Sequence, residues 1–293
     1  MSYPRSMRPR PPHAWTPLFA PTPLHVIGPL RGGAQARRLR CSDGNDWAVK
    51  FLSNPQGRRI LANEWIASAV ARYLGINTPD LSPIWIDQDF IAANNLGIAY
   101  GTRRELITPG YHLGSQWVAF NDEATYDFFP SALLAKVHNR RDFIGALVLD
   151  KLLCNADSRQ CVFISDHGQF YASFIDHGYA FNGPQWEAET PALCGLYHSA
   201  DAYQDLHSSA DFKPWLTKVH DMPRELFAEA VDSMPTQWLT ASDRPVLRTL
   251  LKSIYSSRHT LRARLESLCS SRPTYFPNWQ RSQDHPIPAA RAA

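Results

Sequence analysis

Apolar and polar residues alternate along the first half of the chain in a pattern that is typical of short β-strands. Residues 24–27 and 36–41 predict two strands, which the segment GPLRGGAQ separates. The turn signal SDGN at 42–45 leads into a third strand, WAVKFL, in which Lys50 is a charge on a strand that is otherwise apolar on both faces. Alternation places Lys50 on the face opposite Trp47, Val49 and Phe51, together with Ala48 and Leu52. These elements predict a small antiparallel unit.

A helical pattern follows these strands. Residues 58–74 carry apolar side chains at helical spacing, and Gly75 is a suitable residue at which this helix ends. Glu64 borders the apolar stripe, which consists of Leu61, Trp65, Ile66, Ala69, Val70, Tyr73 and Leu74. We expect the stripe to pack on the sheet, and Glu64 to form an ion pair with Lys50. Two further strands are predicted at 81–86 and near 98–104.

The second half begins near Tyr111, where the pattern shifts toward helix. The strongly apolar run FIGALVLDKLLC predicts a helix that is buried in the core of this half. Two amphipathic helices are predicted later, at 223–234 and 243–268. Strands in the first half and helices in the second indicate an α+β fold.

A hairpin is predicted directly after the apolar helix. The polar run Asn155 to Ser158 precedes CVFI, the turn SDHG and the strand FYASFI, which ends at Asp176. Strand pairing about a turn near His167 would bring Asp157 and Asp176 to the same open end of the hairpin. Two carboxylates at a hairpin mouth are a candidate metal site or acid–base site.

Composition narrows the class of protein. The 293 residues have a formal charge of only +3, which does not suggest a nucleic-acid binder. The five cysteines form no CxxC pair, so we expect neither a zinc site nor a disulfide framework. We expect no transmembrane helix and no secretory signal, and therefore a cytoplasmic location. Residues 1–23 and 271–293 are rich in proline, and we expect a mobile arm and a tail that lies over the surface or is disordered.

Four features in chain order now resemble the requirements of phosphoryl transfer. That reaction needs a backbone and a cation that hold phosphates, a glutamate that fixes the cation, and carboxylates that bind magnesium and orient the acceptor. Each feature alone is weak, since a GG turn is usually only a hairpin and a strand lysine usually reaches solvent. The candidates are the turn glycines Gly32 and Gly33, then Lys50, Glu64, Asp157 and Asp176.

The sequence resembles the HipA-like kinase family, in its smaller bacterial branch, over roughly residues 23–268. The resemblance lies in VKFLSNPQGRRILANEWIASAVARYLGINTPDL, DKLLCNADSRQCVF and FIDHGYAFNGPQW. It implies a bilobal, protein-kinase-like α+β fold, with a nucleotide-binding N-lobe at 24–110, a C-lobe at 111–270, and ATP and Mg²⁺ in the cleft between them. It also implies roles for matching residues: phosphate contact for Lys50, its helix partner for Glu64, the catalytic aspartate for Asp157, the metal ligand for Asp176, and the glycine-bearing loop for Gly32 and Gly33.

One motif departs from the family pattern. The family has Asp-x-His-x-x-Asn, whose last residue is a second metal ligand, whereas this chain has Asp157, Arg159 and Val162 at the corresponding positions. Valine cannot bind magnesium. Three alternatives follow: Asn155 or a water takes the second metal position, the site binds one ion, or the protein only binds a nucleotide. Arg159 either holds a phosphate or the catalytic loop, or forms a salt bridge within the lobe.

Other motifs and functions stay open at this point. HNRRD at 138–142 has the letters of a kinase HRD loop but precedes the apolar helix, which favours a helix start, and Asp150 ranks below Asp157 as a catalytic candidate because it lies within that helix. His177 is either a support for Asp176 or a core histidine. Beside a kinase, the alternatives are an inactive nucleotide-binding regulator, a metal-dependent hydrolase and an interaction module. The acceptor has no motif, and the resemblance favours a protein Ser or Thr hydroxyl.

Overall fold

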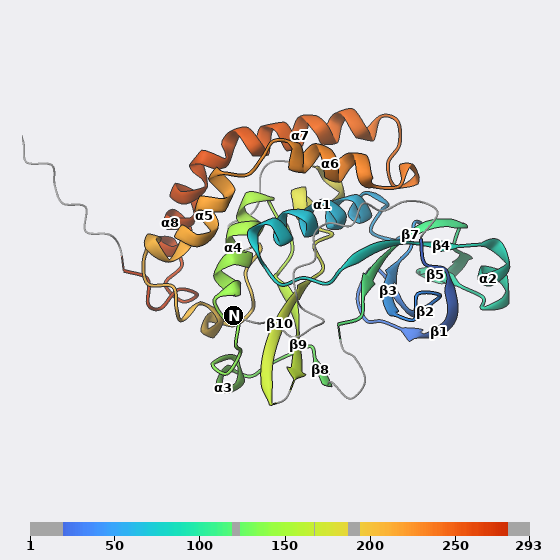
Figure 1. Cartoon of the computed structure of the whole chain (residues 1–293), viewed down its shortest axis with the longest axis horizontal. Helices are drawn as coiled ribbons and strands as arrows, with labels where there is room; N and C mark the ends of the chain where they lie inside the picture. The colour runs from blue at the N-terminus through green and yellow to red at the C-terminus, as the bar shows by residue number, and fades with distance from the viewer. Residues whose placement is uncertain (1–19, 119–123, 167, 187–193, 281–293) are drawn as a thin grey trace, which may run out of the picture.

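Four of the predicted strands form an antiparallel five-stranded sheet with a fifth strand that was not predicted (Figure 1). The computed structural model describes residues 20–118, 124–166, 168–186 and 194–280. The sheet order is β1-β2-β3-β7-β4, with β1 at Pro23–Pro29, β2 at Arg37–Cys41, β3 at Asp46–Lys50, β7 at Gly110–Gln116 and β4 at Leu81–Ile86. The strand β7 lies between β3 and β4, so the sheet extends beyond residue 110, where we expected the first lobe to end.

One face of this sheet has a small hydrophobic core of its own. The helix α2 (Gln88–Ala93) and the hairpin of β5 (Gly97–Tyr100) and β6 (Arg103–Leu106) contribute Ile91 and Ile98 to it. The single strand predicted near 98–104 is therefore two short strands joined by a turn. Trp47, Val49 and Phe51 point into this core, which leaves Lys50 on the opposite face, as the alternation predicts.

The helix α1 (Arg59–Leu74) ends at Gly75, whose φ of 78° lies in the left-handed region that favours glycine. Its buried residues belong to a second, larger core that it shares with α4 (Asp142–Leu152) and α6 (Glu225–Ser233), rather than to the core of the sheet. α1 therefore packs mainly on helices, and the sheet contributes Leu113 of β7 to the shared core, so the expectation that α1 packs on the sheet is met only in part. The physical reason is that its buried surface is wider than one stripe and includes Ile60, Ala62, Ala67 and Ala71, so that helices contact it from several sides.

The predicted hairpin is present and adjoins the larger core. The strands β9 (Gln160–Asp166) and β10 (Gln169–Ile175) pair so that Gln160 is opposite Ile175, and β8 (Ala124–Tyr126) completes a sheet in the order β10-β9-β8. Phe163 and Phe174 pack from one face of this sheet against Phe143 of α4. The open end of the hairpin thus faces away from the turn and carries residues 157 and 176, as predicted.

The C-terminal helices surround α4 and α1 (Figure 1). The helix predicted at 243–268 is broken into α7 (Asp243–Ser257), the 3₁₀ turn η7 (Arg258–Thr260) and α8 (Leu261–Ser271). At the break, the hydroxyls of Ser257 and Thr260 donate to the carbonyls of Ile254 and Ser257, a local bonding pattern that competes with a continuous helix. The remaining helical elements are α3 (Ser131–Leu134), η3 (Ala180–Gln185), η4 (Ala200–Tyr203), η5 (Ser209–Phe212), α5 (Lys213–His220) and η6 (Thr236–Trp238).

The two predicted tails lie mainly outside the described residues. Where the C-terminal one is described, up to residue 280, it does not only cover the surface: Phe276 is buried and packs against Tyr203. Among the described helices, none is long and apolar enough to cross a membrane.

Candidate active site

Lys50, at the end of β3, contacts two carboxylates that come from distant parts of the chain. Its Nζ lies 2.6 Å from Oε2 of Glu64 on α1 and 2.8 Å from Oδ1 of Asp176, which follows β10. The side chain of Asp176 is 33% exposed, whereas that of Glu64 is 5% exposed. The predicted ion pair between Lys50 and Glu64 is confirmed, and Asp176 is the carboxylate of this cluster that a solvent-borne ligand can reach.

Burial and charge act in opposite directions on these three groups. Burial favours the neutral carboxyl of Asp176, but the adjacent Lys50 outweighs it and holds the pKa of Asp176 below its usual range. At Glu64 burial dominates and raises the pKa, although Lys50 opposes it. Burial would lower the pKa of Lys50, but the two carboxylates outweigh it and raise that pKa above its usual value. Asp176 is thus held in the charged form that binds a metal.

The backbone at Asp176 is unusual. Its φ of 56° lies in the left-handed region, which aspartate and asparagine tolerate better than other residues with side chains. Within the part of the chain that the structure describes, the carboxylate accepts a hydrogen bond from Lys50 and from no backbone N–H. The arrangement differs from that of a turn-capping aspartate, whose carboxylate would accept bonds from the following backbone.

Asp157 lies on the loop between α4 and β9. Its Oδ1 accepts a 2.7 Å hydrogen bond from the backbone N–H of Ser158, and its side chain is partly exposed. The loop is fixed on both sides, because the N–H of Ala156 donates to the carbonyl of Tyr179 and the N–H of Gly195 donates to the carbonyl of Asp157. Asp157 is therefore a carboxylate on a positioned loop, at the same hairpin end as Asp176.

A buried ion pair between Arg159 and Asp150 lies next to this loop. The guanidinium of Arg159 forms a bidentate pair with Asp150, with distances of 2.8 Å from Nε to Oδ2 and 2.7 Å from Nη2 to Oδ1. Arg159 Nη1 also donates to the carbonyl of Ile175, the residue before Asp176, and contacts Nδ1 of His177. Gly195 packs against Asp150 so closely that a Cβ on it would lie 2.6 Å from the Cβ of Asp150. The structure thus places Arg159 and Asp150 as a support that joins both halves of the hairpin mouth.

Asn155 and His177 also belong to this buried layer. Asn155 Nδ2 donates to Asp150 Oδ1, and its Oδ1 accepts from the N–H of Asp157. His177 is buried, and burial together with the charge of Arg159 lowers its pKa well below the usual value, so the ring is neutral. Its other nitrogen, Nε2, contacts the hydroxyl of Thr78. Both polar ends of the buried Asn155 side chain are therefore engaged inside the protein.

The segment after Asp176 is attached to α1 by Asn63, a residue that the sequence analysis did not single out. Asn63 Nδ2 lies 2.9–3.0 Å from the carbonyl oxygens of Gly178, Ala180 and Gly183, and its Oδ1 accepts from the indole of Trp186. Asn63 is fully buried. A polar residue inside the apolar stripe of a helix was the available signal. The bonds hold the Asp176 segment beside the helix that carries Glu64.

The predicted glycine-bearing loop joins β1 to β2. Arg37 is paired with Val49, which places this loop at the end of the sheet where Lys50 lies. A Cβ on Gly33 would lie 2.9 Å from the side-chain amide nitrogen Nε2 of Gln56, which precedes α1. The backbone φ of Gly32 is 112°. The loop therefore stands where a backbone could approach phosphates next to Lys50.

The HNRRD segment forms the start of α4. Asn139 Nδ2 donates to Asp142 Oδ2 and to the carbonyl of Ala172, and Asp142 is buried at the first turn of the helix. These contacts agree with a structural role at the helix start, as expected.

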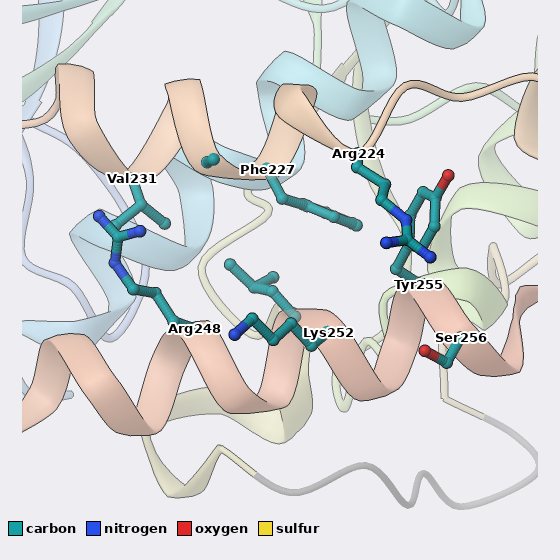
Figure 2. Close-up of a pocket in the computed structure, with 9 residues that line it drawn as sticks. Arg224, Phe227, Val231, Arg248, Lys252, Tyr255 and Ser256 are labelled. Carbon is teal, nitrogen blue, oxygen red and sulfur yellow. The ribbon is translucent and has the colours of Figure 1, made fainter.

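A separate surface groove of about 320 Å³ lies between α6 and α7 (Figure 2). Figure 2 shows Phe227 and Val231 of α6, with Arg224 directly before that helix, facing Arg248, Lys252 and Tyr255 of α7. None of the residues that line the groove belongs to the cluster around Lys50. We assign it no part in the chemistry.

Comparisons with known proteins agree with this geometry. The profile of the HipA-like kinase family matches residues 25–265. The structure is similar to the proinflammatory kinase CtkA of Helicobacter pylori, with a TM-score of 0.50, 13% identity, and coverage of 81% of this chain and 93% of that one. It is also similar to HipA of Shewanella oneidensis MR-1, solved with HipB and operator DNA, with a TM-score of 0.46, 12% identity, and coverage of 85% and 67%.

A search of curated protein sequences finds no significant match. The likeness to CtkA shows the fold, which is kinase-like, and the family match covers most of the chain. The α+β, protein-kinase-like fold and the kinase class that the sequence predicted are thereby confirmed. This chain belongs to the HipA-like kinase family.

Proposed function

We propose that the protein transfers the γ-phosphoryl group of ATP, in the presence of Mg²⁺, to a hydroxyl group, and that the acceptor is a protein Ser or Thr. The observation that carries this proposal is the position of Lys50, which bridges Glu64 and Asp176 at distances of 2.6 and 2.8 Å. A cation fixed between a helix glutamate and a metal-binding aspartate is the arrangement that kinases use to hold phosphates. ATP turnover by the purified full-length chain tests the proposal directly.

Lys50 and the loop of Gly32 and Gly33 would contact the phosphates. Lys50 is positively charged and fixed by Glu64, so it can stabilise negative charge on a phosphate oxygen without reorganising. The loop lies at the same end of the sheet and allows a close approach of its backbone. These groups supply the positioning and electrostatic stabilisation on which phosphoryl transfer mainly depends.

Asp176 and Asp157 suit the two remaining roles. Asp176 is charged and reachable by solvent, and it would hold a magnesium ion, which neutralises charge on the phosphates. The donor set fits this ion, because magnesium takes one or two carboxylates and completes its shell with phosphate oxygens and water. Asp157 has one carboxylate oxygen engaged by the N–H of Ser158, and its partly exposed carboxylate could accept the proton of an acceptor hydroxyl.

Replacement of Lys50 by methionine should lower phosphoryl transfer about 10²-fold, because a fixed positive charge near the phosphates is lost. The same change leaves Glu64 buried without its partner. The double variant K50M/E64Q removes this second effect and is the matched control for folding. Transfer measured with radiolabelled ATP, with melting temperatures for both variants, checks the prediction. Wild-type turnover in the well-folded double variant would exclude Lys50 from the site.

Replacement of Asp176 by asparagine should abolish the part of the ATP-induced rise in melting temperature that requires Mg²⁺. Asparagine tolerates the left-handed backbone at this position, so the free protein should keep most of its stability. The measurement is thermal unfolding of both proteins with ATP plus EDTA and with ATP plus Mg²⁺. An undiminished magnesium-dependent increment in the variant would show that Asp176 is not a metal ligand.

A second candidate function is that of an inactive nucleotide-binding regulator. Val162 favours it, because it replaces the asparagine that serves as a metal ligand in the family pattern. A regulator would show the ATP-dependent rise in melting temperature but no transfer to any hydroxyl, including its own side chains. Mass spectrometry of the protein after incubation with ATP and Mg²⁺ separates the two functions.

A further inference from the structure

We propose that Gln160 provides a second metal-binding oxygen at the hairpin mouth, next to Asp157 and Asp176. This inference rests on the proposed function, because it concerns the ions that accompany ATP. The first observation is positional: the amide nitrogen of Gln160 lies 3.5 Å from Asp157 Oδ2, and Gln160 pairs across the hairpin with Ile175, which directly precedes Asp176. Gln160 thus contacts Asp157 and lies, in the hairpin register, opposite the residue that precedes Asp176.

The side chain of Gln160 points to the site rather than to the core. Its neighbours along β9, Cys161 and Phe163, belong to the larger hydrophobic core. Because successive side chains of a strand point to opposite faces, Gln160 and Val162 share the other face. Gln160 is partly exposed. A partly exposed amide on this face, 3.5 Å from Asp157, can therefore be reached by an ion at the hairpin mouth.

The amide of Gln160 is also available. Among the described residues its side chain has one polar contact, the 3.5 Å approach to Asp157, which is too long to be a strong hydrogen bond. Rotation of the amide by half a turn presents the carbonyl oxygen in place of the nitrogen, since the two ends have nearly the same shape. An amide oxygen is a hard ligand of the kind that Mg²⁺ and Mn²⁺ accept.

The other candidates near the hairpin mouth are not available. Both ends of the Asn155 amide are engaged, by Asp150 and by the N–H of Asp157. The guanidinium of Arg159 is positively charged and paired with Asp150, and Val162 has no ligand atom. Of these positions, Gln160 is the one that combines a ligand oxygen with the right face of the strand.

The test counts the metal ions bound with a nucleotide, which does not depend on activity. Mn²⁺ is titrated into the full-length protein with saturating ADP, and bound ions are measured by electron paramagnetic resonance. Three variants accompany the wild type: Q160A, the rescue variant Q160A/V162N, and the control Q169A. Gln169 lies on the other strand of the hairpin, next to the turn and away from its open end, where its side chain accepts a hydrogen bond from Tyr171. Melting temperatures of all four proteins check that the substitutions leave the fold intact.

We expect the wild type and Q169A to bind about two ions, and Q160A to lose the weaker one through a drop in its affinity of at least tenfold. The asparagine of Q160A/V162N lies on the same strand face, so this variant should regain the weaker ion. A wild type that binds a single ion with ADP, or a Q160A variant that binds both ions as tightly as the wild type, would overturn the role of Gln160 and leave the proposed function standing. Absence of any metal-dependent ADP binding in the wild type would overturn both proposals.

Discussion

Asp157→Asn is expected to lower the rate of phosphoryl transfer by about 10²–10⁴-fold while changing nucleotide affinity little. The carboxylate would orient the acceptor hydroxyl and take its proton, an interaction that gains strength only in the transition state. Asparagine keeps an oxygen that can accept the N–H of Ser158, so the loop should keep its shape. Single-turnover transfer from radiolabelled ATP, together with nucleotide affinity by calorimetry, measures the two quantities separately.

The melting temperature of the Asp157→Asn variant serves as the control for its folding. The anchors of the loop are backbone bonds from Ala156 to Tyr179 and from Gly195 to Asp157, and the substitution removes neither of them. The melting temperature should therefore stay close to that of the wild type. A transfer rate equal to that of the wild type would show that another group is the base, whereas weaker nucleotide binding with unchanged transfer would indicate a metal-binding role for Asp157.

Asp150→Asn is expected to lower the free energy of unfolding by about 3–5 kcal/mol, because it leaves the charge of Arg159 buried without a partner. The side chains of both residues are at most 2% exposed. The chain offers a matched control in Asp205→Asn. Asp205 forms a bidentate pair of nearly the same geometry with Arg140, at 2.9 and 2.7 Å. The side chains of this pair are more exposed, at 30% for Asp205 and 21% for Arg140.

Because solvent screens the exposed pair, Asp205→Asn should cost about 1 kcal/mol or less. Urea unfolding of both variants measures the difference. Equal losses in the two variants would contradict the view that burial decides the strength of the Arg159 support. Since Arg159 also bonds the carbonyl of Ile175, Asp150→Asn should further loosen the backbone before Asp176, which hydrogen exchange at the hairpin mouth can detect.

The parts of the fold that follow from local pattern were predictable. Alternation in WAVKFL placed Lys50 on the face opposite Trp47, Val49 and Phe51, and the structure shows it there. The hairpin followed from one turn between two apolar runs, and its register brings residues 157 and 176 to one end. The pairing of Lys50 with Glu64 followed from chemistry once the order of the groups was recognised.

Features that depend on distant packing were not predictable. The strand β7 inserts between β3 and β4, and nothing in its own sequence indicates which strands flank it. The helical partners of α1 were not predicted, because an apolar stripe does not state whether a sheet or helices cover it. For Arg159, the sequence left phosphate contact and an internal salt bridge open. In the structure Arg159 pairs with Asp150, and this pairing depends on the burial of both side chains, which the sequence does not state.

The membership of α1 in the larger core has a mechanical consequence. Lys50 lies at the end of β3 and Glu64 lies on α1, so their ion pair joins the five-stranded sheet to that helix. An outward movement of α1 would have to open a core shared with α4 and α6, whereas a shift of the five-stranded sheet would disturb that core mainly at Leu81 and Leu113. Relative motion of the sheet and α1 should therefore move the sheet more than the helix. A pair of spectroscopic labels on β3 and α1 would report this motion, while a pair on α1 and α4 would stay at a constant distance.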